Sequence, residues 1–251
     1  MMQTLAELWP ALVDWYDTTL ATPAENLALD EVLLQQVEAD PARACLRTWE
    51  PTQTFVVVGR SNRVDVEVNE DECRAQGIPL FRRSSGGGAV VVGRGCLAYA
   101  IALPLNDEIR SAGVSVVTRR VMETIALQLQ AFAPGVTVCG TSDLAIDDRK
   151  FSGNSQRWLR QAFLHHGTIL YEFDLEQIGR LLKAPSRQPD YRLQRSHADF
   201  VTNVEVSRER LLSCLVAAWK GHRAELSPAN LQQTRALAES RYERAEWNLE
   251  R

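Results

Sequence analysis

Three consecutive glycines follow two arginines and two serines in the run Arg82-Arg83-Ser84-Ser85-Gly86-Gly87-Gly88. Glycines have no side chain, so another molecule can approach their backbone N–H groups closely. The adjacent guanidinium groups supply fixed positive charge that suits a phosphate or a carboxylate. A mobile turn with solvated arginines would have the same composition, so this segment alone leaves both interpretations open.

A second segment combines a lysine with an acidic turn. Leu144 and Ile146 alternate with polar residues, two aspartates follow, and Lys150 precedes Gly153 by three positions. The pattern predicts a hairpin in which Lys150 begins the return strand and Gly153 allows close backbone approach. A lysine at such a turn is usually a solvated charge. It acquires a chemical role only if the fold brings other functional groups to it.

A pair of histidines lies in an apolar, strand-like run. Neighbouring residues of a strand point to opposite faces, so His165 and His166 cannot both face one site or form a two-histidine metal site alone. One of them can face a pocket, and a half-buried histidine with local hydrogen bonds is the structural alternative.

Two nucleotide-binding motifs are excluded. The triple glycine lacks the Lys-Ser or Lys-Thr that follows in a P-loop. The run Gly93-Arg94-Gly95-Cys96-Leu97-Ala98 partly matches a dinucleotide fingerprint, but that fingerprint must begin a helix. Here the chain continues as an apolar strand that Pro104 ends.

Composition narrows the class of protein. The 251 residues are 45% hydrophobic and 24% charged, which predicts a globular domain with a sizeable core. A formal net charge of -4 argues against general nucleic-acid binding. We see no apolar run near the roughly 20 residues of a membrane-spanning helix. The five cysteines are odd in number and lack the spacing of metal pairs, which favours a reducing cytoplasm.

Periodicity predicts the elements that must position these groups. Helices are expected over residues 23–38, 68–76, 115–133, 175–183, 207–226 and 228–244. Strands are expected over 44–49, 54–58, 79–83, 89–92, 96–103, 136–139, 144–147 and 163–173, and a loop over 184–199. Thr22 and Glu25 form a capping box at the first helix. Strands occur in pairs without regular alternation with helices, which favours an α+β fold with a mixed or largely antiparallel sheet.

Five segments, taken in order, resemble the lipoate–protein ligase A family within the biotin/lipoate protein ligase superfamily, which includes lipoyl and octanoyl transferases. They are Asn26 to Glu31, Trp49 to Arg60, Arg82 to Val90, Asp143 to Gly153 and His165 to Thr168. The resemblance covers about residues 20–205. It implies a biotin/lipoate protein ligase-like (class II synthetase-like) fold, in which helices flank a mixed, largely antiparallel sheet.

The resemblance implies a single catalytic domain over residues 1–251, with a core at about 20–205 and a C-terminal helical tail at 206–251. We expect no full C-terminal accessory domain of the kind found in the larger ligases, and a separate accessory subunit is therefore a further expectation. The implied reaction activates lipoate or octanoate with ATP and Mg²⁺ as an acyl-AMP. The acyl group then passes to a lysine of a lipoyl acceptor protein, either the E2 lipoyl domain of a 2-oxoacid dehydrogenase or a glycine cleavage H-like protein.

The family's functional residues fall on the motifs quoted above. Lys150 corresponds to the lysine that binds the lipoyl carboxylate and the transferred group, and His166 to a histidine near the acyl pocket. Asp143 corresponds to an acidic position near the nucleotide and is the expected Mg²⁺ ligand. The remaining expected contacts to substrate or ATP are Arg82, Arg83, Ser85, Gly86, Gly87, Gly88, Ala89, Val90, Val91, Ser152, Gly153, Gly167 and Thr168. We expect the acyl pocket between the triple glycine and the Lys150 hairpin.

Departures from the family pattern keep two other hypotheses open. Val91-Val92-Gly93 replaces the usual His-Asp pair. Cys139 precedes Asp143, and some relatives use a cysteine in this loop as the nucleophile of an ATP-independent octanoyltransferase. A cysteine needs a lowered pKa for that role, and a buried structural cysteine is the alternative. The loss of the His-Asp pair also permits a non-catalytic module that binds an acyl group or cofactor.

Overall fold

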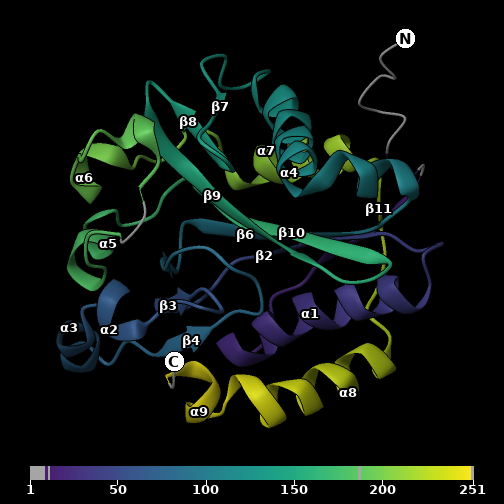
Figure 1. Cartoon of the computed structure of the whole chain (residues 1–251), viewed down its shortest axis with the longest axis horizontal. Helices are drawn as coiled ribbons and strands as arrows, with labels where there is room; N and C mark the ends of the chain where they lie inside the picture. Colours follow the sequence, from purple (N-terminus) through teal and green to yellow (C-terminus); the bar gives the residue numbers. More distant parts are fainter. Residues whose placement is uncertain (1–8, 11, 186–187, 250–251) are drawn as a thin grey trace.

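A large mixed sheet forms the centre of the protein. The computed structural model describes residues 9–10, 12–185 and 188–249 (Figure 1). The ends of the predicted domain and two residues of the predicted loop, 186 and 187, lie outside the described residues. The strand order is β11-β1-β2-β6-β10-β9-β8-β7. These strands are β1 (Val13–Asp17), β2 (Cys45–Trp49), β6 (Cys96–Pro104), β7 (Thr137–Cys139), β8 (Asp143–Ile146), β9 (Arg149–Trp158), β10 (Ala162–Leu170) and β11 (Gly221–Arg223).

Pairing within this sheet is parallel at one edge and antiparallel elsewhere. β1 lies parallel to both β11 and β2, whereas β2 pairs antiparallel with β6, and every later pair is antiparallel. A second sheet has the order β4-β3-β5 and comprises β3 (Phe55–Val58), β4 (Leu80–Arg82) and β5 (Val90–Val92). The predicted α+β fold with a mixed, largely antiparallel sheet is therefore confirmed.

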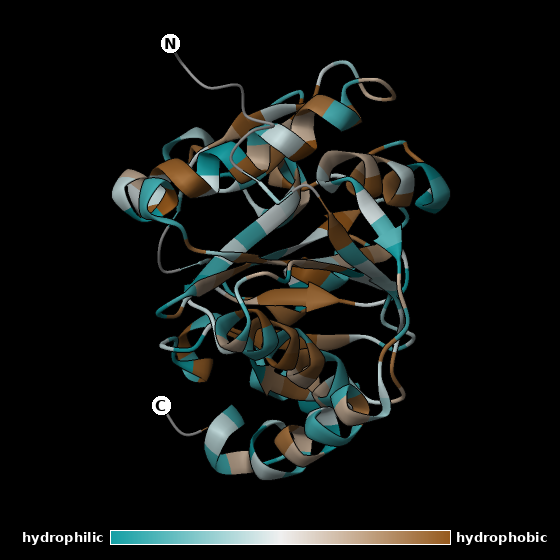
Figure 2. Ribbon diagram, turned by 90° about the vertical axis from the view of Figure 1, so that its right-hand side faces the viewer, coloured by the Kyte–Doolittle hydropathy of each residue, from teal (hydrophilic) through white to brown (hydrophobic). Residues whose placement is uncertain are grey.

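Helices cover both faces of the large sheet, as Figure 2 shows. On one face lie α4 (Asp107–Leu129) and α7 (Arg208–Trp219), and on the other lies α1 (Pro23–Ala39), which α8 (Pro228–Leu237) covers in turn. Shorter helices complete the fold: α2 (Val64–Glu67), α3 (Glu70–Ala75), α5 (Glu176–Leu181), η2 (Asp190–Arg192), α6 (His197–Phe200), η3 (Ala238–Tyr242) and α9 (Ala245–Asn248). Among the described residues, no helix has the length and apolar character needed to cross a membrane.

Local signals predicted most of these elements but missed those that depend on pairing. The capping box at Thr22 is present and begins α1 where expected. The edge strand β11 and its neighbour β1, which pair in parallel, were not predicted. The helix expected over 207–226 was wrong at its end, because Lys220 adopts a left-handed φ of 50° and the chain turns into β11. The long helix begins earlier than expected, because Asn106 caps it and Gly113 allows a kink.

A buried carboxylate joins three distant parts of the chain. Glu31 of α1 is 2% exposed and accepts hydrogen bonds from Arg157 of β9 and from Arg241 and Tyr242 near the C-terminal end. Burial raises the pKa of this carboxyl, but the Tyr242 hydrogen bond and the two arginine charges outweigh burial, so the pKa lies below its ordinary value. The glutamate in the first family segment thus stabilises the packing of α1, β9 and η3.

We therefore expect Glu31→Gln to lower the free energy of unfolding by about 3 kcal/mol, because two guanidinium groups lose their shared counter-charge. Urea denaturation followed by circular dichroism measures the loss. The control is Glu176→Gln, which removes the exposed ion pair with Arg180 and should cost under about 1 kcal/mol. Equal losses of unfolding free energy in the two variants would show that the buried cluster at Glu31 contributes no more to stability than an exposed ion pair.

Candidate active site

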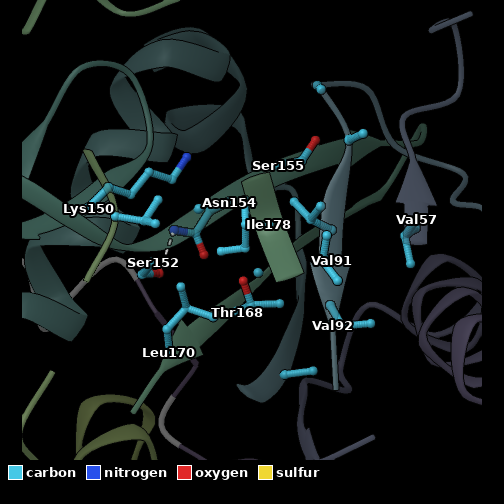
Figure 3. Close-up of a pocket in the computed structure, with 18 of the residues that line it drawn as sticks. Val57, Val91, Val92, Lys150, Ser152, Asn154, Ser155, Thr168, Leu170 and Ile178 are labelled. Atoms are coloured by element: carbon cyan, nitrogen blue, oxygen red, sulfur yellow. Dashed lines mark hydrogen bonds between the residues drawn. The ribbon is translucent and has the colours of Figure 1, made fainter. Parts of the chain in front are cut away.

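A cavity of about 260 Å³ lies between the large sheet and the small sheet. Figure 3 shows Lys150 on one side of it and Val91 and Val92 of β5 on the other. Most of its wall is apolar, including Leu27, Trp49, Val57, Val91, Val92, Ala98, Leu170, Ile178, Leu182, Phe200 and Val201. A cavity with apolar walls and a few polar groups suits a ligand that is mostly hydrocarbon with a polar end.

Small residues on the sheet make room for this cavity. Gly153 of β9 pairs with Thr168 of β10, which pairs with Ala98 of β6, which pairs with Trp49 of β2. Residues directly opposite each other in a sheet point to the same face. This row therefore forms a continuous strip in which only Trp49, at one end, has a large side chain.

The Lys150 ammonium lies directly over Gly153. A Cβ atom on that glycine would be 2.7 Å from Lys150 Nζ, so only glycine leaves space for the amine. Nζ pairs with Asp143 Oδ1 at 2.8 Å, and Tyr191 donates a hydrogen bond to Asp143 Oδ2, also at 2.8 Å. The lysine side chain is 29% exposed. The amine is thus held at the cavity wall by one carboxylate rather than extended into bulk solvent.

The triple-glycine loop is held in shape by Arg83. Its guanidinium donates to the carbonyl oxygens of Gly86 and Gly88 at 2.6 and 2.9 Å and to that of Val57 at 3.3 Å. Gly87 has a φ of 88°, which favours glycine, and its carbonyl lies where a side chain on Gly59 would be. Burial lowers the pKa of Arg83 to about 10, so it remains a cation at neutral pH.

His166 is a neutral group at the cavity wall. Burial, with the nearby Arg83 charge, lowers its pKa to about 3. Ser85 Oγ accepts a hydrogen bond from Arg83 Nε at 3.1 Å and lies 2.6 Å from His166 Nε2. The other ring nitrogen, Nδ1, lies 4.0 Å from Asp30 Oδ2, so the imidazole stands between the Ser85 hydroxyl and a buried carboxylate. His166 is therefore a neutral imidazole at neutral pH that lines the cavity.

Sequence comparison assigns this site to a family. The model of the lipoyl protein ligase A/B catalytic domain matches residues 22–214. The chain belongs to this family. A probable lipoate-protein ligase A of Mycoplasma genitalium is 27% identical over 235 residues, which cover 90% of this chain and 68% of that relative. A protein of the same name from Mycoplasma pneumoniae is 31% identical over 160 residues, 64% of this chain but only 46% of that relative.

Solved structures show the same fold. A lipoate-protein ligase A bound with ATP has a TM-score of 0.81 at 21% identity and covers 94% of this chain and 98% of its own. A Thermoplasma acidophilum protein with bound lipoic acid has a TM-score of 0.79 at 20% identity, over 94% and 99% of the two chains. A bipartite lipoate protein ligase from the same organism, described with its E2 lipoyl domain, has a TM-score of 0.78 at 22% identity, over 94% and 95%. At identities this low, the structural similarity establishes the fold alone.

Most residues expected from the ligase family lie on the cavity wall. They are Arg83, Gly87, Gly88, Ala89, Val90, Val91, Lys150, Ser152, Gly153, His166, Gly167 and Thr168. Ser85 and Asp143 lie behind the wall, where they bond His166 and Lys150. Gly86 accepts hydrogen bonds from Arg83 and Ser155.

Arg82 has a different position from the one expected of a ligand contact. It is fully buried and does not line the cavity. Its guanidinium donates to the carbonyl oxygens of Gly59, Asn62, Trp247 and Asn248. The side chains of neighbouring strand residues alternate, so Arg82 turns away while Arg83 turns toward the cavity. Arg82 instead fastens the C-terminal segment to β4.

Several wall residues were missed because the sequence predicted only the start of β9, as a return strand that begins at Lys150. Asn154 lies where a side chain on Gly167 would be, accepts a hydrogen bond from Tyr99, and donates one to Ser152 (Figure 3). The run from Arg149 to Trp158 is too polar for a core strand. The polar run was itself a signal for β9, because a strand whose side chains line a cavity need not alternate apolar and polar residues.

Cys139 lies at the end of β7, opposite Asp143 in the register. It is half-buried and does not line the cavity, and its Sγ lies 3.5 Å from Thr137 Oγ1. The cysteine is therefore a neighbour of the carboxylate that holds Lys150, one strand away from the wall. Direct attack on a ligand in the cavity would require this hairpin to move.

The geometry does not fit Asp143 as a Mg²⁺ ligand. Both of its oxygens are engaged, one by the Lys150 ammonium and one by the Tyr191 hydroxyl. A divalent cation there would lie against an ammonium group, which like-charge repulsion opposes. Within the described part of the chain, no group of three or more His, Cys, Asp or Glu residues could hold a metal ion.

The two buried histidines should make the protein sensitive to acid. Burial lowers the pKa of both His165 and His166 to about 3, from 6.5 in an unfolded chain. Only the unfolded chain binds these protons, so this contribution to stability is complete above pH 6.5 and is lost as the pH falls toward 3.

In His166→Gln, the decline of the unfolding free energy between pH 6 and pH 4 should be shallower by about 1 kcal/mol per pH unit, since one such proton is removed. Urea denaturation at several pH values measures the slope. An unchanged slope would mean that His166 is protonated in the folded protein.

Proposed function

We propose that this protein is an ATP-dependent lipoate–protein ligase. It activates lipoate, or octanoate, as an acyl-AMP and transfers the acyl group to a lysine of an acceptor lipoyl domain. The observation that carries the proposal is the Lys150 ammonium, held over Gly153 at the wall of an apolar cavity. A hydrocarbon chain fits the apolar walls, and its carboxylate fits the amine.

The polar groups suit the activation step. A carboxylate does not react with an amine until it is activated, and ATP supplies the leaving group. A carboxylate oxygen of the substrate bonds to the α-phosphorus of ATP, the bond to the bridging oxygen breaks, and pyrophosphate leaves. Lys150 can exchange Asp143 for the substrate carboxylate and stabilise the negative charge that gathers there. The backbone of the triple-glycine loop presents N–H groups without intervening side chains.

The second step needs position more than acid–base chemistry. The neutral acceptor amine attacks the acyl carbonyl, AMP leaves, the nitrogen releases a proton to solvent, and an amide forms. His166 is neutral across the physiological range and bonds Ser85, so it serves as a fixed polar group of the wall rather than a proton carrier. Correct placement of the mixed anhydride supplies most of the rate in such a step.

The comparisons support this assignment of substrates and acceptor. The relatives have the name lipoate-protein ligase A, and structures of this fold were solved with ATP and with lipoic acid. We propose an E2 lipoyl domain as the acceptor, by analogy with the Thermoplasma ligase described with its own, and an H-like protein as a second one. That ligase is bipartite, so an accessory subunit is part of the proposal.

We further propose that Mg²⁺ reaches the site with the phosphates of ATP rather than on Asp143, and that the reaction takes place in the cytoplasm. All five cysteines are free thiols, which is consistent with a reducing compartment. We also propose that residues 22–214 act as one catalytic domain.

A second candidate function is ATP-independent octanoyl transfer through Cys139. The proximity of Cys139 to Asp143 and its partial exposure favour this candidate. Its position away from the cavity wall ranks it below the ligase.

Lys150→Ala should reduce lipoyl-AMP formation by about 10²- to 10³-fold, because the charge that meets the carboxylate is lost. Transfer of label from lipoate to an acceptor lipoyl domain, with ATP and Mg²⁺, measures the effect. Lys183→Ala is the matched control, since that ammonium bonds the carbonyl oxygen of Asp65 outside the cavity. A Lys150 variant as active as the control would refute the proposed function.

Cys139→Ala separates the two candidate functions in the same assay. The ligase predicts full activity with lipoate and ATP. Transfer from octanoyl-[acyl carrier protein] without ATP, abolished in Cys139→Ala, would reverse the ranking.

Gly153→Ala should lower kcat/KM for lipoate by about tenfold while the melting temperature changes little. The new methyl group displaces the flexible end of Lys150 rather than backbone, so the fold tolerates it but the amine leaves its position. Gly179→Ala is the control, because the nearest atom to a Cβ there is 4.0 Å away. Retention of full activity in Gly153→Ala would show that the amine need not lie over this glycine.

A further inference from the structure

Arg192 is a buried cation on the cavity wall that none of the family segments contains. It ends η2, inside the polar stretch 184–199 that the sequence predicts as a loop, and it is 5% exposed. Its guanidinium lies over the ring of Phe200, with 4.8 Å from Cζ to the ring centroid. The aromatic face stabilises the charge but accepts no conventional hydrogen bond.

Most of the hydrogen-bond donors of Arg192 have no partner in the described part of the protein. Nε donates to the carbonyl oxygen of Arg195 at 3.0 Å. The two terminal nitrogens form no hydrogen bond or salt bridge with any described residue. The Asp143 carboxylate contributes a weak attraction but is already bonded to Lys150 and Tyr191. Because the side chain lines the cavity, these N–H groups are available to a ligand that accepts hydrogen bonds.

The other two cations of the described cavity wall, Arg83 and Lys150, already have hydrogen-bond or ion-pair partners in the protein. Every nitrogen of the Arg83 guanidinium bonds the loop or Val57, so Arg83 shapes the cavity and has little left for a ligand. Lys150 shares its charge with Asp143. Arg192 is thus the wall cation, among the described residues, whose donors are free for an anion.

Arg192 also lies near Lys150. Its neighbour in the chain, Tyr191, donates the hydrogen bond to the Asp143 carboxylate that holds Lys150. The charges of Arg192 and Lys150 both act on His197, which lines the same cavity. The η2 segment therefore places a second positive charge beside the position where the substrate carboxylate meets Lys150.

We propose that Arg192 binds the phosphate group that becomes joined to the acyl carboxylate. The proposal rests on the proposed ligase function and deepens it. The substrate carboxylate and the α-phosphate of ATP, both anions, must approach each other in the activation step. The single charge of Lys150, which Asp143 already pairs, cannot offset both. A planar guanidinium can bond two phosphate oxygens at once. Arg192 gives up no proton in the step, since the bond changes are those of the carboxylate, the α-phosphorus and the departing pyrophosphate.

The test compares wild type with Arg192→Met, which keeps an unbranched side-chain stem and removes the guanidinium and its charge. We expect KM for ATP in lipoyl-AMP formation to rise about 10- to 100-fold, because a charge-assisted bidentate contact is lost. Binding of lipoate alone, measured by calorimetry, should change less than threefold. The melting temperature without ligands should change little, because the terminal nitrogens bond no described residue and only the Nε hydrogen bond is lost.

Arg195→Met is the matched control. Arg195 lies over the same Phe200 ring at 5.3 Å, but it bonds backbone carbonyls of Asp148, Tyr191 and Arg192 and does not line the cavity. It should lower the melting temperature and leave KM for ATP within about threefold of wild type.

The outcomes distinguish the two levels of the proposal. An unchanged KM for ATP in Arg192→Met overturns the role of Arg192 and leaves the ligase function intact. A lower melting temperature, or an equal rise of KM for ATP in Arg195→Met, assigns Arg192 a structural role and also overturns it. If wild type forms no lipoyl-AMP, the proposed function itself is wrong, and the inference about Arg192 is overturned with it.

Discussion

The site depends on one ion pair held over a residue without a side chain. Lys150 can lie against the sheet only because Gly153 leaves the space open, and it stays there because Asp143 compensates its charge. A free ammonium at an apolar wall would extend into water, where its hydration is better. The ion pair therefore keeps the amine at the cavity wall, where the proposed reaction has a substrate carboxylate exchange for Asp143.

Around this pair, buried polar groups support one another instead of contacting a ligand. Arg83 bonds the carbonyl oxygens of the glycine loop, and Ser85 accepts from Arg83 and bonds His166. These bonds fix the loop and the imidazole before any ligand arrives. Preorganised donors of this kind are effective because they need no rearrangement during the reaction. The motif from Arg83 to Gly88 therefore acts largely through the shape that it gives the cavity.

Rigidity at the site also depends on distant segments. Arg82 bonds the C-terminal residues Trp247 and Asn248, and Glu31 bonds both β9 and η3. Since β9 bears Lys150 and Gly153, the cluster at Glu31 connects the position of the amine to the packing of α1. Charged residues of the family segments thus divide into those that face the cavity and those that hold its walls together.

The sequence by itself determined the fold class, the capping of α1, and the residues Lys150, Gly153 and His166, because these depend on local periodicity and on motif order. Tertiary structure alone decided which of two adjacent arginines faces the cavity, since that depends on strand orientation. It also decided that β1 and β11 pair, that a polar run forms the long strand β9, and that Arg192 lies in the wall. Contacts between residues far apart in the chain leave no periodic signal, so only the folded protein reveals them.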